Sequence, residues 1–148
     1  MTQVSYKLLT DGATAPTQAT DGSAGFDLYA DLGGGDMTTM ILPGEHKVVS
    51  TGVAMAIPRL MVGLICPRSG LSAKHGVTVH NGPGVIDSDY RGAIGIVLHN
   101  TSRAPFMVMH GDRVAQLVIV PAPQIQLKAV ADIEATVRAS GGFGSSGR

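Results

Sequence analysis

Short stretches in which apolar and polar residues alternate recur along the whole chain, each bounded by glycine, proline or aspartate. The alternation is clear at residues 4–8, 26–30 and 53–57, a continuous apolar run covers residues 60–66, and residues 114–120 are apolar except for Gln116. A period of two residues indicates half-buried β-strands, and turn signals at short spacing are typical of a sandwich or barrel. We therefore predict an all-β fold with further strands at residues 40–42, 47–50, 77–80, 92–98, 106–109 and 125–130.

Only residues 69–76 favour a helix, because Ser69 suits the capping position at the start and Gly76 follows the end. The segment is too short to be stable alone, so we expect it to pack against the sheet. The first N–H groups of a helix have no partners within it, and beside Arg68 they would suit an anion such as phosphate. An ordinary helix start next to a solvated arginine is the alternative.

The composition limits the class of protein. The chain has 148 residues, which fits one domain, and its 20 glycines and 8 prolines favour turns over long helices. Eleven Lys and Arg residues balance eleven Asp and Glu residues, which argues against a protein that wraps nucleic acid. The sequence shows neither a membrane-spanning apolar stretch nor a signal peptide, and we interpret its one cysteine, Cys66, as a packed thiol. We expect a cytoplasmic protein with no nucleic-acid or membrane partner.

The last eleven residues differ from the rest of the chain. Residues 138–148 contain four glycines and one bulky apolar side chain, Phe143, so they cannot bury enough surface to order themselves. We predict a β-domain over residues 1–137 and a flexible, glycine-rich tail over residues 138–148. The tail is either a frayed terminus or a flap that folds over a ligand.

Residues 81–92 are the most unusual stretch, with glycines and a proline around an apolar pair, followed by acidic residues, a tyrosine and an arginine. A hairpin here would present main-chain groups to a flat polar ring. Asp87 follows Val85 and Ile86, so we expect it at the edge of the core, where a carboxylate can act as a general base. The alternative is an ordinary turn, since Asp and Gly are common turn residues.

Other polar residues give weaker signals. Asp27 lies within an apolar strand pattern, so it faces either solvent or a functional site, and Gln116 lies in a similar pattern. The five histidines lack the sequence spacing of metal ligands, so we interpret them as structural or surface residues.

Taken together, five segments in order resemble the motifs of the trimeric dUTP diphosphatase (dUTPase) family. They are residues 24–30 (AGFDLYA), 67–71 (PRSGL), 81–92 (NGPGVIDSDYRG), 111–117 (GDRVAQL), and Arg138 with 141–147 (GGFGSSG). The resemblance implies a jelly-roll-like β-barrel that assembles as a homotrimer. It also implies active sites to which one subunit gives the first, second and fourth motifs, the next subunit the third, and the last subunit the tail.

The family's reaction is the hydrolysis of dUTP to dUMP and diphosphate, by attack of water at the α-phosphorus with Mg²⁺. This reaction keeps uracil out of DNA and supplies dUMP for thymidylate synthesis. By resemblance, Asp87 orients and deprotonates the water, and Tyr90 stacks on the deoxyribose and leaves no room for a 2′-hydroxyl. The residues expected to read the uracil edge are Asn81, Gly84, Val85 and Ile86.

The resemblance assigns the remaining residues to the phosphates, the base and the metal. Asp27 holds a Mg²⁺-bound water, and Arg138 pairs with the γ-phosphate. Phe143 stacks over the uracil while Gly144, Ser145 and Ser146 close on the substrate. The residues expected to hold phosphate oxygens are Arg68, Ser69, Gly70 and Gln116.

Two positions depart from the family pattern. Ala93 stands where Glu or Gln is common, which we expect to alter a surface or interface contact, and Ser146 stands where Thr is common. Two other functions compete with the dUTPase interpretation. A dCTP deaminase, or a bifunctional deaminase–diphosphatase, would need a glutamate acting on the pyrimidine amino group. A non-catalytic trimeric scaffold would fit the loss of Asp87, Arg138 or Phe143, and all three are present.

Overall fold

The computed structural model describes residues 2–35, 37–136 and 139–140. This part of the chain forms antiparallel strands and one short helix, which confirms the all-β prediction. No helix within the described residues is long and apolar enough to cross a membrane. The elements are β1 (Ser5–Leu8), β2 (Gly25–Tyr29), β3 (Thr38–Ile41), β4 (His46–Ser50), β5 (Val53–Ala56), β6 (Met61–Cys66), α1 (Ser69–His75), β7 (Val77–Val79), β8 (Gly84–Ile86), β9 (Gly95–Asn100), β10 (Phe106–Met109) and β11 (Arg113–Pro121).

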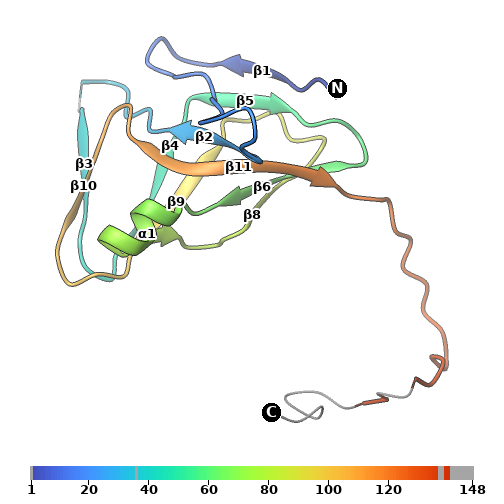
Figure 1. Ribbon diagram of the computed structural model, residues 1–148. Coiled ribbons are helices and arrows are strands. Elements are labelled where there is room, and N and C mark those ends of the chain that lie inside the picture. The colour runs from blue at the N-terminus through green and yellow to red at the C-terminus, as the bar shows by residue number, and fades with distance from the viewer. Residues whose placement is uncertain (1, 36, 137–138, 141–148) are drawn as a thin grey trace.

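The strands form four small sheets rather than one closed barrel. The largest has the order β2-β11-β6-β8, and β4-β9-β7 form a second sheet, while β1 pairs with β5 and β3 with β10. In Figure 1 the long strand β11 crosses the middle of the molecule between β2 and β6. Since β11 pairs with both neighbours, residues far apart in the sequence meet along it.

The core is built from aliphatic side chains. Strand alternation directs one face of each sheet inward, and none of the fully buried residues in the described part of the chain is aromatic. Such a core agrees with a sequence that has no tryptophan, three Tyr and three Phe. Its largest fully buried members include Leu28, Ile41, Val49, Val53, Ile57, Ile96, Leu98 and Leu117.

The predicted strand at residues 125–130 is wrong. Residues 122–130 have no regular secondary structure, and Figure 1 shows the chain leaving the body after β11 as an extended arm. Ile125 is 78% and Leu127 94% exposed. The alternating pattern is present, but a strand needs a neighbour for its N–H and C=O groups, and nothing within the described chain pairs with this segment.

Two local predictions need correction. Residues 81–92 do not form a hairpin of their own, because β8 pairs with β6 instead. The N-cap of α1 is Arg68 and not Ser69, with no side-chain capping bond, since Ser69 is already the first helical residue. The predicted helix end is confirmed: Gly76 has φ 65° and its N–H bonds to the carbonyls of Leu71 and Ser72.

Candidate functional site

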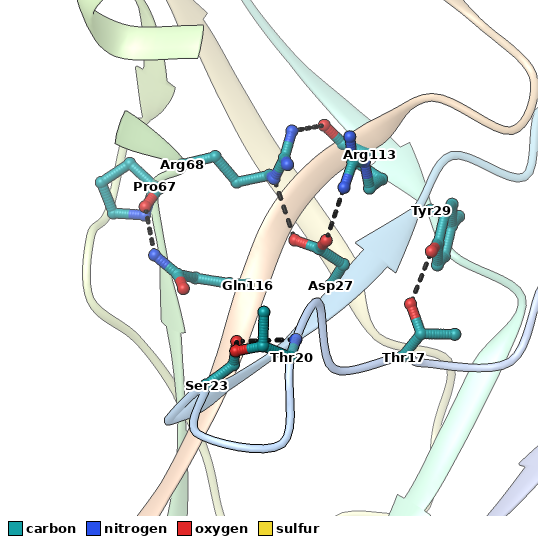
Figure 2. A network of polar contacts seen from close by, with 9 residues as sticks. All are labelled: Thr17, Thr20, Ser23, Asp27, Tyr29, Pro67, Arg68, Arg113 and Gln116. Carbon is teal, nitrogen blue, oxygen red and sulfur yellow. Dashed lines mark hydrogen bonds and ion pairs between the residues drawn. The ribbon is translucent and has the colours of Figure 1, made fainter. Parts of the chain in front are cut away.

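Strands β2 and β11 and the end of β6 bring a buried carboxylate and two arginines together (Figure 2). Arg68 Nε donates to Asp27 Oδ1 at 2.9 Å, and Arg113 Nη1 donates to Asp27 Oδ2 at 3.2 Å. The Asp27 side chain is only 11% exposed, against 24% for Arg68 and 49% for Arg113. Of the two orientations left open by the sequence, Asp27 therefore takes the one that faces other polar groups.

Arg113 was not among the candidates that the sequence analysis singled out. Gln116 lies opposite Asp27, and simple alternation would turn Arg113 to the other face, because it lies three residues away. A register shift between Arg113 and Ala115 places Arg113 opposite Tyr29, on the same face of β2 as Asp27. Arg113 reaches this face because of a β-bulge, and a sequence pattern of period two does not reveal a bulge.

The side chain of Gln116 links β11 to the loop before α1. Its Nε2 donates to the Pro67 carbonyl at 3.0 Å, which holds the amide beside Arg68 (Figure 2). A Cβ at Gly25 would lie 2.7 Å from Gln116 Oε1, so the missing side chain at residue 25 leaves room for this amide. Ser69 is exposed at the start of α1, as is the neighbouring Gly70.

A second group of predicted residues surrounds a cavity of about 180 Å³. Asn81, Gly84, Val85, Ile86 and Tyr90 all line it, together with residues from β6, β7 and β9. A Cβ on Gly84 would lie 3.3 Å from Asn81 Nδ2, so the amide of Asn81 lies directly over the main chain of residue 84. The cavity is thus lined by apolar side chains and by many polar atoms.

Asp87 and Tyr90 belong to a tight turn that follows β8. The Tyr90 N–H donates to the Asp87 carbonyl at 3.2 Å, and Arg91 Nη1 donates to the carbonyls of Ser88 and Tyr90, each at 2.8 Å. Asp87 was expected at the edge of the core, but it is exposed, whereas its neighbours Ile86 and Ser88 are half-buried. The Tyr90 hydroxyl donates to the Ala93 carbonyl at 2.9 Å, and Ala93 lines the cavity.

In the single chain these two groups do not share a cavity. Arg68 and Arg113 line a different hollow of about 330 Å³ with residues of α1 and β10, and neither lines the cavity beside Tyr90. The predicted tail residues Arg138, Phe143, Gly144, Ser145 and Ser146 lie outside the described residues.

Three histidines meet on one face of the β4-β9-β7 sheet, which their sequence spacing did not reveal. The His80 ring stacks on His46 at 4.8 Å and meets His99 edge-on at 4.8 Å. His46 and His80 are exposed and His99 is half-buried. The described residues contain no group of three His, Cys, Asp or Glu side chains that could hold a metal ion.

The sequence of this chain matches a known protein family. The dUTPase family model matches residues 11–147. Deoxyuridine 5′-triphosphate nucleotidohydrolases from Wolbachia pipientis subsp. Culex pipiens and from Anaeromyxobacter sp. are 46% and 47% identical to the chain. The first alignment covers 99% of this chain and 96% of the relative, the second 90% and 87%.

Solved structures with a similar fold are also dUTPases. A mutant of the Staphylococcus bacteriophage 80alpha dUTPase, with dUpNHpp, has a TM-score of 0.89 and 30% identity over the full length of both chains. A mutant of the dUTPase from phage phi11 of S. aureus, described for its coordination of a structural Mg(II) ion, has a TM-score of 0.80 and 28% identity over 90% of this chain and 100% of that one. The sequence matches and the similar folds point to the same family, and the chain belongs to the dUTPase family.

Proposed function

We propose that this protein hydrolyses dUTP to dUMP and diphosphate, which keeps uracil out of DNA and supplies dUMP for dTTP synthesis. The observation that carries the proposal is the cavity lined by Asn81, by the residues of β8 and by Tyr90, with Asp87 directly after β8. The dUTPase of phage 80alpha, whose fold this chain shares, was solved with dUpNHpp, which supports a deoxyuridine nucleotide as the ligand.

The cavity suits uracil because Asn81 and residues 84–86, whose backbone can donate and accept hydrogen bonds, are among the residues that line it. Main-chain donors and acceptors are fixed in position, so they match one pattern of base edges and reject others. Cytosine has an amino group where uracil has a carbonyl, and it would leave cavity groups unpaired. The deaminase alternative has less support, since Asp87, and not a glutamate, follows β8.

Tyr90 is placed to select the sugar. Its ring lines the cavity while its hydroxyl is tied to the Ala93 carbonyl, so the ring can form a wall against the deoxyribose. A ribose carries an additional 2′-hydroxyl, which this wall would exclude. We therefore assign discrimination between dUTP and UTP to Tyr90.

The phosphates are assigned to the group around β11. Arg68 uses Nε to bind Asp27 and Nη1 to reach the Arg113 carbonyl at 3.3 Å, which fixes the guanidinium plane and leaves Nη2 for a phosphate oxygen. Ser69 and Gly70 offer a hydroxyl and N–H groups at the exposed start of α1. Gln116 completes this set, and Arg138 is assigned to the γ-phosphate.

In the reaction Asp87 accepts a proton from water as the water oxygen forms a bond to the α-phosphorus. The bond from that phosphorus to the bridging α–β oxygen breaks, and diphosphate leaves with the bonding electrons. An exposed carboxylate suits this step because it reaches solvent water. Residues 138–148 are proposed to close over the site as a flap, with Phe143 on the base and Gly144, Ser145 and Ser146 on the phosphates.

The reaction is proposed to need Mg²⁺, which when bound neutralises phosphate charge during bond breaking. The described residues form no cage of three protein ligands, so the triphosphate and water would supply most of the coordination. Asp27 fits a role through a metal-bound water, since each of its oxygens accepts one hydrogen bond and a carboxylate has further lone pairs.

We further propose a homotrimer in which each active site is shared between subunits. Two features support an assembly: the predicted residues fall into two separate hollows, and the arm after β11 exposes apolar side chains. A complementation experiment tests the sharing, because Arg68→Ala and Asp87→Asn chains, each inactive alone, should regain about a quarter of wild-type turnover when co-refolded in equal amounts. Absence of any recovery in verified mixed oligomers would show that both residues act within one chain.

The activity itself is tested with Mg²⁺ and dUTP, dCTP, dTTP or UTP in parallel, with diphosphate, ammonia and nucleotide products all identified. Diphosphate and dUMP from dUTP alone are the expected products. Ammonia from dCTP would move the protein to the deaminase class. Binding of dUTP without turnover would identify a scaffold that keeps the cavity and lacks the chemistry.

A further inference from the structure

The side chain of Tyr90 folds back over the chain two residues further on. A Cβ built on Gly92 would lie 2.5 Å from Tyr90 Oη, 2.7 Å from Cζ and 3.1 Å from Cε2. Real Cβ atoms essentially never show the first two distances, so the phenol ring occupies the space that any side chain at residue 92 would take. Beyond this point, the ring's hydroxyl donates to the Ala93 carbonyl at 2.9 Å.

Nothing in the backbone requires glycine at this position. Gly92 is not among the glycines with positive φ, so alanine could adopt its conformation without strain. The missing side chain therefore matters because of the tyrosine ring. Gly22 provides a contrast, since its φ is also not positive and a Cβ there would meet no atom within 4 Å.

Burial does not hold the ring in place. Tyr90 is 43% exposed, so few neighbours oppose its movement away from residue 92. Its position at the cavity depends on two local features, the open space over Gly92 and the bond to the Ala93 carbonyl. A small side chain at residue 92 would move the ring at little cost in stability, because an exposed ring can turn toward solvent.

We infer that Gly92 is a specificity-determining positioning residue: it touches no substrate, but its lack of a side chain fixes the Tyr90 ring where the ring excludes a 2′-hydroxyl. This inference rests on the proposed function, and in particular on the role of Tyr90 toward the sugar. It assigns sugar selection to a pair of residues rather than to the tyrosine alone.

The test compares kcat/KM for dUTP and UTP in wild type, Gly92→Ala and the control Gly22→Ala. For Gly92→Ala we expect the dUTP-to-UTP ratio to fall about tenfold or more, through loss of turnover on dUTP and gain on UTP, with a nearly unchanged melting temperature. Gly22→Ala should keep the wild-type ratio. An unchanged ratio in folded Gly92→Ala overturns the inference.

A double-mutant cycle separates this role from general damage. If Gly92 acts through the ring, Gly92→Ala should change the ratio no further once Tyr90→Ala has removed the ring, and additive effects would refute the mechanism. Tyr90→Phe removes only the hydrogen bond to the Ala93 carbonyl, so it should lower the dUTP-to-UTP ratio by a smaller factor. If Gly92→Ala does not fold, Tyr90→Phe takes its place as the test of ring position. Turnover of dUTP by the wild-type protein is measured in the same series. If the wild type does not turn over dUTP, the proposed function and this inference both fail. If it does, and Gly92→Ala keeps the wild-type dUTP-to-UTP ratio, this inference alone fails.

Discussion

The Asp27 ion pairs provide a stability prediction that can be worked out contact by contact. Asp27→Asn keeps the size of the side chain and removes its charge, so one guanidinium loses a charged acceptor and the other faces an amide NH₂ group. The contact with Arg68, 2.9 Å long and mostly buried, is worth about 1.5–3 kcal/mol as a charge-assisted hydrogen bond. The contact with Arg113 involves a side chain that is 49% exposed, so solvent screening reduces it to below about 1 kcal/mol.

We therefore expect Asp27→Asn to lower the free energy of unfolding by about 2–3 kcal/mol, and Arg113→Met by less than about 1 kcal/mol. At about 2–4 °C per kcal/mol for a domain of this size, Asp27→Asn should lower the melting temperature by about 4–12 °C. Urea and thermal unfolding are measured at one protomer concentration, because assembly contributes to apparent stability. Asp21→Asn, which removes a charge from an exposed loop, is the matched control and should stay within about 0.5 kcal/mol of wild type.

The reasoning is tested by ranking the three variants by their loss of unfolding free energy. Equal losses in Asp27→Asn and Arg113→Met would mean that exposure does not govern these two contacts, which contradicts the reasoning. A loss in Asp27→Asn no larger than in Asp21→Asn would show that the buried carboxylate contributes nothing to stability and is kept only for the site.

Three further predictions concern activity. Asp87→Asn should still bind dUTP, measured by calorimetry, and lose at least about 100-fold in turnover; equal turnover would remove Asp87 from the role of base. Deletion of residues 138–148 should abolish most turnover while circular dichroism and the oligomeric state stay unchanged, and dissociation instead would show that the tail is structural. Gly25→Ala places a Cβ 2.7 Å from Gln116 Oε1, so we expect weaker dUTP binding, seen as a raised KM, and an unchanged KM would argue against phosphate contact by that amide.

Predictions from sequence succeed here where the determining interactions are local. The strand patterns at residues 26–30, 53–57 and 114–120 match β2, β5 and β11, because a run of alternating or apolar residues between turn signals favours a strand locally. Gly76 ends the helix as predicted, since its left-handed conformation favours glycine.

Apart from the start of α1, where Arg68 and not Ser69 is the N-cap, predictions fail where the determining interaction is non-local. The arm at residues 125–130 has a strand pattern but no neighbour within the described chain, and residues 81–92 choose β6 as a partner over a hairpin. Arg113 reaches Asp27 only through a shift in register, which no periodicity announces. The three histidines come from different parts of the chain, and only the sheet order brings them together.

The proposed assembly would explain both the exposed arm and the divided site. Ile125, Leu127 and Ile133 are 78%, 94% and 89% exposed, and burying each such side chain is worth about 1.5–3 kcal/mol, so leaving all three in water is unfavourable. If a second copy covers this arm, copies are held in fixed positions relative to one another. Fixed neighbouring copies are also what would allow the cavity beside Tyr90 in one chain to face Arg68 of another. A segment that looks like an unfinished strand in one chain would then be the element that completes the active site.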